Sequence, residues 1–84
     1  MNENRIMIVD DEVDILNLLE KALNIEGYYN ITKVDNGLDA VSICKQIQPN
    51  VIILDIMLPG IDGYEVCKRI RQFSHCPILF LSSK

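Results

Sequence analysis

The sequence predicts an α/β fold built on a doubly wound parallel sheet, and three observations lead to this prediction. Four short apolar runs, rich in β-branched residues, are distributed along the 84 residues. Between them the apolar residues recur every three or four positions, as on one face of a helix. The runs are nearly continuous, which is typical of strands buried on both faces of a parallel sheet. Strict alternation of strands and helices implies right-handed crossovers, with helices on both faces of the sheet.

The first half of the chain contains two predicted strands and two predicted helices. A strand is expected at residues 6–9 ("IMIV"), and a helix follows from Val13 until Gly27 supplies a stop. The stretch "YNITKV" at 29–34 roughly alternates, as an edge strand would. Asn36 and Gly37 predict a turn, and the next helix is expected to end before Pro49.

The second half continues the same alternation. Residues 51–54 ("VIIL") predict a third strand, residues from about 63 to 73 a third helix, and residues 78–81 ("ILFL") a fourth strand. We find no repeat, linker or low-complexity segment, so residues 1–84 are expected to form one domain.

Composition and charge exclude several classes of function. The chain is 49% hydrophobic and 24% charged, with a net charge of −4, which gives no support to nucleic-acid binding by this chain. The first residues do not resemble a signal peptide, and no apolar stretch approaches the ~20 residues that span a bilayer. We therefore expect a cytoplasmic protein without membrane contact. The three cysteines, Cys44, Cys67 and Cys76, lack metal-ligand spacing and are expected to be reduced thiols.

Acidic residues stand at the ends of two predicted strands. Asp10 and Asp11 follow the first strand, and Asp55 follows the third. Carboxyl ends of parallel strands share one edge of a sheet, so neighbouring strands would bring the three carboxylates together. Carboxylates about 4 Å apart repel by about 4 kcal/mol at an effective dielectric of about 20, so such a cluster needs a cation. Mg²⁺ prefers oxygen ligands and can meet a phosphoryl group beside a carboxylate able to attack it.

Simpler explanations exist for each acid taken alone. Asp10 and Asp11 precede a helix, where acids favour the helix dipole, and Asp62 is expected to cap the third helix. Asp55 differs because no helix begins directly after it. The combination of Asp10 and Asp11 with Asp55 is therefore more specific than either half. Ser82 could simply end the fourth strand.

Four stretches together resemble one known family. They are "IMIVDDEVDIL", "DNGLDAV", "PNVIILDIMLPGIDGYEVCKRIR" and "CPILFLSSK", and they cover the chain in order. They resemble the receiver domain of bacterial two-component response regulators, most closely that of winged-helix transcription factors of the OmpR/PhoB type. The resemblance implies a flavodoxin-like sheet of strand order 2-1-3-4 and a sensor histidine kinase as partner.

The same resemblance implies roles for individual residues. Asp55 would be the phosphoacceptor, and Ser82 the hydroxyl that reorients toward the phosphoryl group. Mg²⁺ would be bound by Asp55, by Asp11 directly, by Asp10 chiefly through water, and by the main-chain oxygen of Met57.

The resemblance ends before the family pattern does. Receivers have five strands and five helices, so the sequence predicts a receiver truncated after the fourth strand. The fifth-strand lysine that pairs with the phosphoryl group would be missing, and Lys84 is expected to be a local loop residue. Phosphorylation is then expected to be slow or undetectable. The uncovered edge of strand 78–81 predicts self-association as a dimer, and a DNA-binding domain is expected in a full-length relative.

Three alternatives remain beside a phosphoacceptor domain. A Mg²⁺-dependent phosphatase with an aspartyl intermediate would want a second acid two residues after the nucleophile, where this chain has Met57. A nucleotide or flavin binder would want a glycine-rich phosphate loop after the first strand, and none is present. A fragment that acts only as a folding or self-association module stays open.

Overall fold

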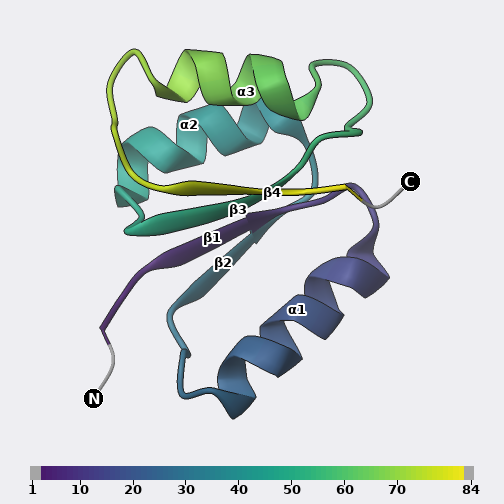
Figure 1. Ribbon diagram of the computed structural model, residues 1–84, viewed down its shortest axis with the longest axis vertical. Helices are drawn as coiled ribbons and strands as arrows, with labels where there is room; N and C mark the ends of the chain where they lie inside the picture. Colours follow the sequence, from purple (N-terminus) through teal and green to yellow (C-terminus); the bar gives the residue numbers. More distant parts are fainter. Residues whose placement is uncertain (1–2, 83–84) are drawn as a thin grey trace.

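The computed structural model describes residues 3–82 and contains one parallel sheet. Its strands β1 (Ile6–Val9), β2 (Ile31–Val34), β3 (Val51–Asp55) and β4 (Ile78–Leu81) are arranged in the order β2-β1-β3-β4. The connecting helices are α1 (Val13–Ile25), α2 (Gly37–Ile47) and α3 (Gly63–Ile70). Figure 1 shows α1 on one face of the sheet and α2 and α3 on the other. The predicted fold class and strand order are confirmed.

The core consists of two apolar layers separated by the sheet. Met7 and Val9 of β1 belong to the layer under α2 and α3, whereas Ile6 and Ile8 belong to the layer under α1. Every residue of β1 is buried, because this central strand is covered on both faces. Full burial of such a side chain stabilises the fold by about 1.5–3 kcal/mol, which explains the continuous apolar run.

Details at the ends of several elements differ from the prediction, and β3 includes Asp55. Strand β2 begins at Ile31 rather than at residue 29, and Tyr29 is 72% exposed. Helix α3 ends at Ile70, and residues 71–73 form turns. Asn36 is the N-cap of α2 rather than a turn residue, because its side chain accepts a hydrogen bond of 2.9 Å from the backbone N–H of Asp39.

Strand register determines where the acidic residues lie. Strand β1 pairs with β2 on one side and β3 on the other, with Val9 opposite Val34 and Leu54. The residue after Val9 is Asp10, and the residue after Leu54 is Asp55, so both project from the same edge of the sheet. Within the described part of the chain, no helix is long and apolar enough to cross a bilayer.

Candidate metal and phosphoacceptor site

Three carboxylates from two neighbouring strands meet at the carboxyl edge of the sheet. One side-chain oxygen each from Asp10, Asp11 and Asp55 lies within 4.8 Å of the others. Asp10 and Asp55 are each only 1% exposed, whereas Asp11 is exposed. The cluster therefore has a buried side formed by two acids and an open side formed by the third.

The environment of Asp10 disfavours its ionised form. Burial raises the pKa of Asp10, the hydrogen bond from the backbone N–H of Glu12 lowers it in part, and the charges of Asp55 and Asp11 raise it further. That hydrogen bond reaches Oδ1 at 2.9 Å. The other oxygen, Oδ2, is buried and accepts no hydrogen bond from residues 3–82. A buried carboxylate in this state requires a proton or a cation.

The donor set fits Mg²⁺. All three candidate ligands are hard carboxylate oxygens, and the exposed side near Asp11 leaves room for the waters that this ion retains. Neighbouring ligands of an octahedron with bonds of 2.0–2.1 Å lie about 3 Å apart, and opposite ones about 4 Å apart. Oxygens within 4.8 Å of one another need only small shifts to reach these separations.

The loop after β3 fixes the orientation of Asp55. Its Oδ1 accepts a hydrogen bond of 3.1 Å from the backbone N–H of Met57, which turns the loop back over the strand end. The first residue of α3 then packs directly on the strand: the backbone N–H of Gly63 donates to the carbonyl oxygen of Ile56 at 2.9 Å.

Gly63 is a positioning residue that sequence reasoning missed. A Cβ at this position would overlap the carbonyl oxygen of Asp55 and would lie 2.8 Å from Cα of Ile56. Only glycine allows α3 to begin this close to the strand that carries Asp55. The available signal was the glycine at the start of "GYEV".

An open cavity of about 480 Å³ adjoins the acidic cluster. Its lining residues are Asp11, Ile56, Met57, Leu58, Pro59, Asp62 and Tyr64. Met57 is 54% exposed, so this part of the rim is accessible to solvent. Ser82 is exposed and directly follows Leu81, the residue that pairs with Asp55 in the sheet. Lys84 lies outside the described residues.

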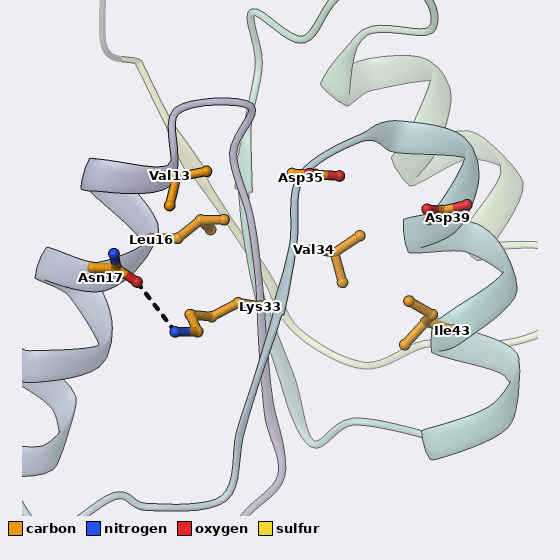
Figure 2. A pocket seen from close by; sticks show the side chains of 8 residues that line it. All are labelled: Val13, Leu16, Asn17, Lys33, Val34, Asp35, Asp39 and Ile43. Carbon is orange, nitrogen blue, oxygen red and sulfur yellow. Dashed lines mark hydrogen bonds between the residues drawn. The ribbon is translucent and has the colours of Figure 1, made fainter.

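A second cavity, of about 270 Å³, lies at the β2 edge of the sheet and is separate from the acidic cluster. Figure 2 shows that residues of α1, β2 and α2 line it. Lys33 Nζ is held there by Asn17 Oδ1 at 3.1 Å and by Glu20 Oε1 at 2.8 Å. None of Asp10, Asp11 and Asp55 lines this cavity. The ammonium group of Lys33 therefore binds side chains of α1.

Comparisons with known proteins agree with this arrangement. Residues 6–84 match the family described as "Response regulator receiver domain". The chain is 42% identical over 83 residues to "Probable transcriptional regulator ycf27" of Porphyridium aerugineum, covering 99% of this chain and 34% of the relative. It is 37% identical over 84 residues to "Transcriptional regulatory protein YvrH" of Bacillus subtilis (strain 168), covering 100% of this chain and 35% of the relative. The chain thus spans about a third of the length of these curated relatives.

A solved structure shows the same fold. The N-terminal domain of a response regulator receiver protein from Methanoculleus marisnigri JR1 superposes with a TM-score of 0.90 at 27% identity, covering 99% of this chain and 69% of that chain. The sheet is parallel with the strand order β2-β1-β3-β4, and the ends of two of its strands carry acidic residues. The family match covers residues 6–84. This chain belongs to the response regulator receiver domain family of two-component systems.

Proposed function

We propose that this chain is a phosphoacceptor domain that takes a phosphoryl group from a phosphohistidine of a sensor histidine kinase onto Asp55. The observation that carries the proposal is the convergence of Asp10, Asp11 and Asp55 within 4.8 Å at the carboxyl edge of the sheet. Asp55 is suited to the acceptor role because it ends a buried strand and its Oδ1 is oriented by Met57. The adjoining cavity leaves the cluster open to a donor.

The transfer is a simple displacement at phosphorus. A carboxylate oxygen of Asp55 forms the new P–O bond, the P–N bond to the donor imidazole breaks, and the leaving nitrogen takes up a proton. Mg²⁺, when bound, offsets the negative charge of the phosphoryl oxygens and the carboxylates. Its proposed ligands are Asp55, Asp11, the main-chain oxygen of Met57 and, through water, Asp10. Ser82 is proposed to donate its hydroxyl hydrogen to a phosphoryl oxygen.

We infer that the output is transcription regulation, since the relatives are transcriptional regulators. The sequence resemblance favours the OmpR/PhoB type, in which a separate DNA-binding domain contacts the operator. With a net charge of −4, the present chain is not expected to contact DNA itself. The domain is proposed to act in the cytoplasm and to catalyse only its own modification.

Phosphorylation by a small phosphodonor tests the proposal. The chain is incubated with acetyl phosphate and Mg²⁺, and intact mass is measured. We expect slow, substoichiometric labelling with one phosphoryl group that hydroxylamine removes, as for an acyl phosphate, and that is absent from Asp55→Asn and in excess EDTA. Asp39→Asn is the matched control, because Asp39 is an exposed aspartate that lines the separate cavity at the β2 edge of the sheet. Equal labelling of Asp55→Asn contradicts the assignment.

A folding or self-association module is the second candidate, and one observation favours it. Leu79 is 58% exposed on β4, which is an edge strand of the sheet among the described residues. We propose that two copies can pair along this edge. A chain that dimerises but is not labelled under the conditions above would favour this second function.

A further inference from the structure

Two of the three cysteines lie together at the amino-terminal edge of the sheet, the edge opposite the acidic cluster. Cys44 belongs to α2 and is 1% exposed, whereas Cys76 is half-buried in the segment that leads into β4. Both pack in the apolar layer under α2 and α3, and the thiol of Cys76 lies close enough to that of Cys44 to raise its pKa. All three cysteines are free thiols.

Backbone hydrogen bonds hold both cysteines at this edge. The backbone N–H of Gln48 donates to the carbonyl oxygen of Cys44 at 3.0 Å, just before the chain enters β3. The N–H of Cys76 donates to Ser74 Oγ at 3.2 Å, and Pro77 next to it accepts from Ile52 of β3 at 3.0 Å. Figure 1 shows the end of α2 and the connection from α3 to β4 at the same edge of the sheet.

An open cavity of about 630 Å³ borders Cys44. The lining residues are Cys44, Lys45, Gln48, Phe73, Ser74 and His75, and no carboxylate is among them. Lys45 Nζ lies 5.2 Å from the centroid of the Phe73 ring, which places a positive charge beside the cavity. Positive surroundings with partial exposure are typical of cysteines that react with oxidants.

The two thiols differ in their surroundings. Burial, and after it the neighbouring Cys76, raise the pKa of the Cys44 thiol to about 11, although Arg71 opposes the shift. Cys44 is therefore a poor first nucleophile at neutral pH. Cys76 is the more exposed member of the pair, so we expect it to react first with an oxidant.

We propose that Cys44 and Cys76 are a reversible oxidation site, at which a peroxide converts the two neighbouring thiols into an intramolecular disulfide. The thiolate of Cys76 attacks the O–O bond of hydrogen peroxide, which forms a sulfenic acid and releases hydroxide that leaves as water. The sulfur of Cys44 then attacks the sulfur of Cys76, the S–S bond forms, and the departing hydroxide takes the proton of Cys44 as a second water. Two electrons pass from the sulfurs to the peroxide, and a dithiol reductant reverses the reaction.

The disulfide would join α2 to the start of β4 and would close the segment that contains β3 and α3. A closed segment restricts the unfolded chain, so the oxidised form is expected to melt at a higher temperature than the reduced form. This oxidation site is independent of phosphoryl transfer at Asp55.

Treatment of the purified chain with a small excess of hydrogen peroxide tests the proposal. Intact mass should fall by two hydrogen atoms, the number of titratable thiols should fall from the three free cysteines to one, and dithiothreitol should restore all three. Peptide mapping should find Cys44 linked to Cys76, with Cys67 still reduced. The melting temperature should rise on oxidation and return on reduction.

Single-cysteine variants provide the controls. Cys67→Ser is the matched control, since Cys67 is half-buried in the same apolar layer but is not among the groups that act on the Cys44 thiol, and it should form the disulfide as the parent does. Cys44→Ser should stop at a sulfenic acid on Cys76 that dimedone traps, and Cys76→Ser should form no intramolecular disulfide. Retention of all three thiols, a linkage through Cys67, or dimers linked by intermolecular disulfides alone would overturn the proposal.

Discussion

Removing the charge of Asp10 should stabilise the chain in the absence of divalent metal. Asp10 is 1% exposed, and its pKa is raised by burial and by the charges of Asp55 and Asp11. At neutral pH its ionised form therefore destabilises the folded state. Asparagine has the same shape, and its Oδ1 can still accept the hydrogen bond from Glu12. We expect Asp10→Asn to increase the free energy of unfolding.

The magnitude follows from the separation of the carboxylates. Two full charges 4.8 Å apart repel by roughly 3.5 kcal/mol at an effective dielectric of about 20. Each charge is shared between two oxygens, and water reaches the cluster from the side of Asp11, so we expect a gain of about 1–3 kcal/mol. In a domain of this size, each kcal/mol shifts the melting temperature by about 4–8 °C.

Urea unfolding followed by circular dichroism at pH 7 measures this effect. In EDTA, Asp10→Asn should unfold at a higher urea concentration than the parent. Saturating Mg²⁺ should stabilise the parent and stabilise the variant less, because a ligand that binds only the folded state adds to its stability according to its affinity. Glu26→Gln removes an exposed charge and should change stability by less than about 0.5 kcal/mol. Destabilisation by Asp10→Asn in EDTA, or an equal Mg²⁺ response in both proteins, would refute the reasoning.

Three further predictions concern pH, backbone packing and assembly. Because the folded-state pKa of Asp10 is raised, the folded chain binds more protons than the unfolded chain. In EDTA the parent should therefore lose stability relative to Asp10→Asn as pH rises from about 4 through that raised pKa. Urea titrations at several pH values measure the difference in unfolding free energy between the two proteins, and a difference that does not change with pH contradicts the prediction. Gly63→Ala should cost about 3 kcal/mol of unfolding free energy because its Cβ would overlap backbone, whereas Gly60→Ala, which meets no atom but has a φ of +78°, should cost about 1 kcal/mol. Light scattering should report a dimer at micromolar concentration that Leu79→Lys weakens, and a strictly monomeric parent would count against pairing along β4.

The strands and the convergence of the acidic residues were predictable from the sequence for the same reason. A central parallel strand is covered on both faces, so it must be a continuous apolar run, and a polar residue can follow only where the strand leaves the core. Asp55 stands at that point, and so does Asp10. Once the alternation of strands and helices had fixed parallel pairing, convergence of the two acids followed from the neighbouring positions of β1 and β3.

Local ambiguity explains the errors at the ends of elements. Asn followed by Gly is compatible with a turn and with a helix N-cap, and the choice at Asn36 depends on whether Asp39 presents its N–H. The polar and aromatic residues before Ile31 continue the alternation of a strand, but in the parallel register Tyr29 lies before the first residue of β1 and has no strand to pair with. Pairing, rather than local pattern, decides where β2 begins.

Contacts between distant residues were not predictable from a single sequence. The need for glycine at position 63 arises from how closely α3 approaches Asp55. Likewise, Cys44 and Cys76 meet because the ends of α2 and of the connection after α3 share one edge of the sheet. The distance along the chain between Gly63 and Asp55, or between Cys44 and Cys76, does not indicate that these residues lie close together. Their proximity results from how the helices and strands are arranged in space.

The two ends of the sheet should behave as independent sites. The acidic cluster lies at the last residue of β3 and directly after β1, and the cysteine pair lies before the first residues of β3 and β4. Strand β3 has five residues, so about 15 Å of strand separates the two edges. Perturbations this far apart without shared contacts usually add to within about 0.5 kcal/mol. Mg²⁺ should therefore increase the free energy of unfolding equally in the reduced and the oxidised chain, when urea titrations of both forms are compared. A difference above about 1 kcal/mol would show instead that β3 couples the two edges, and oxidation would then regulate metal binding.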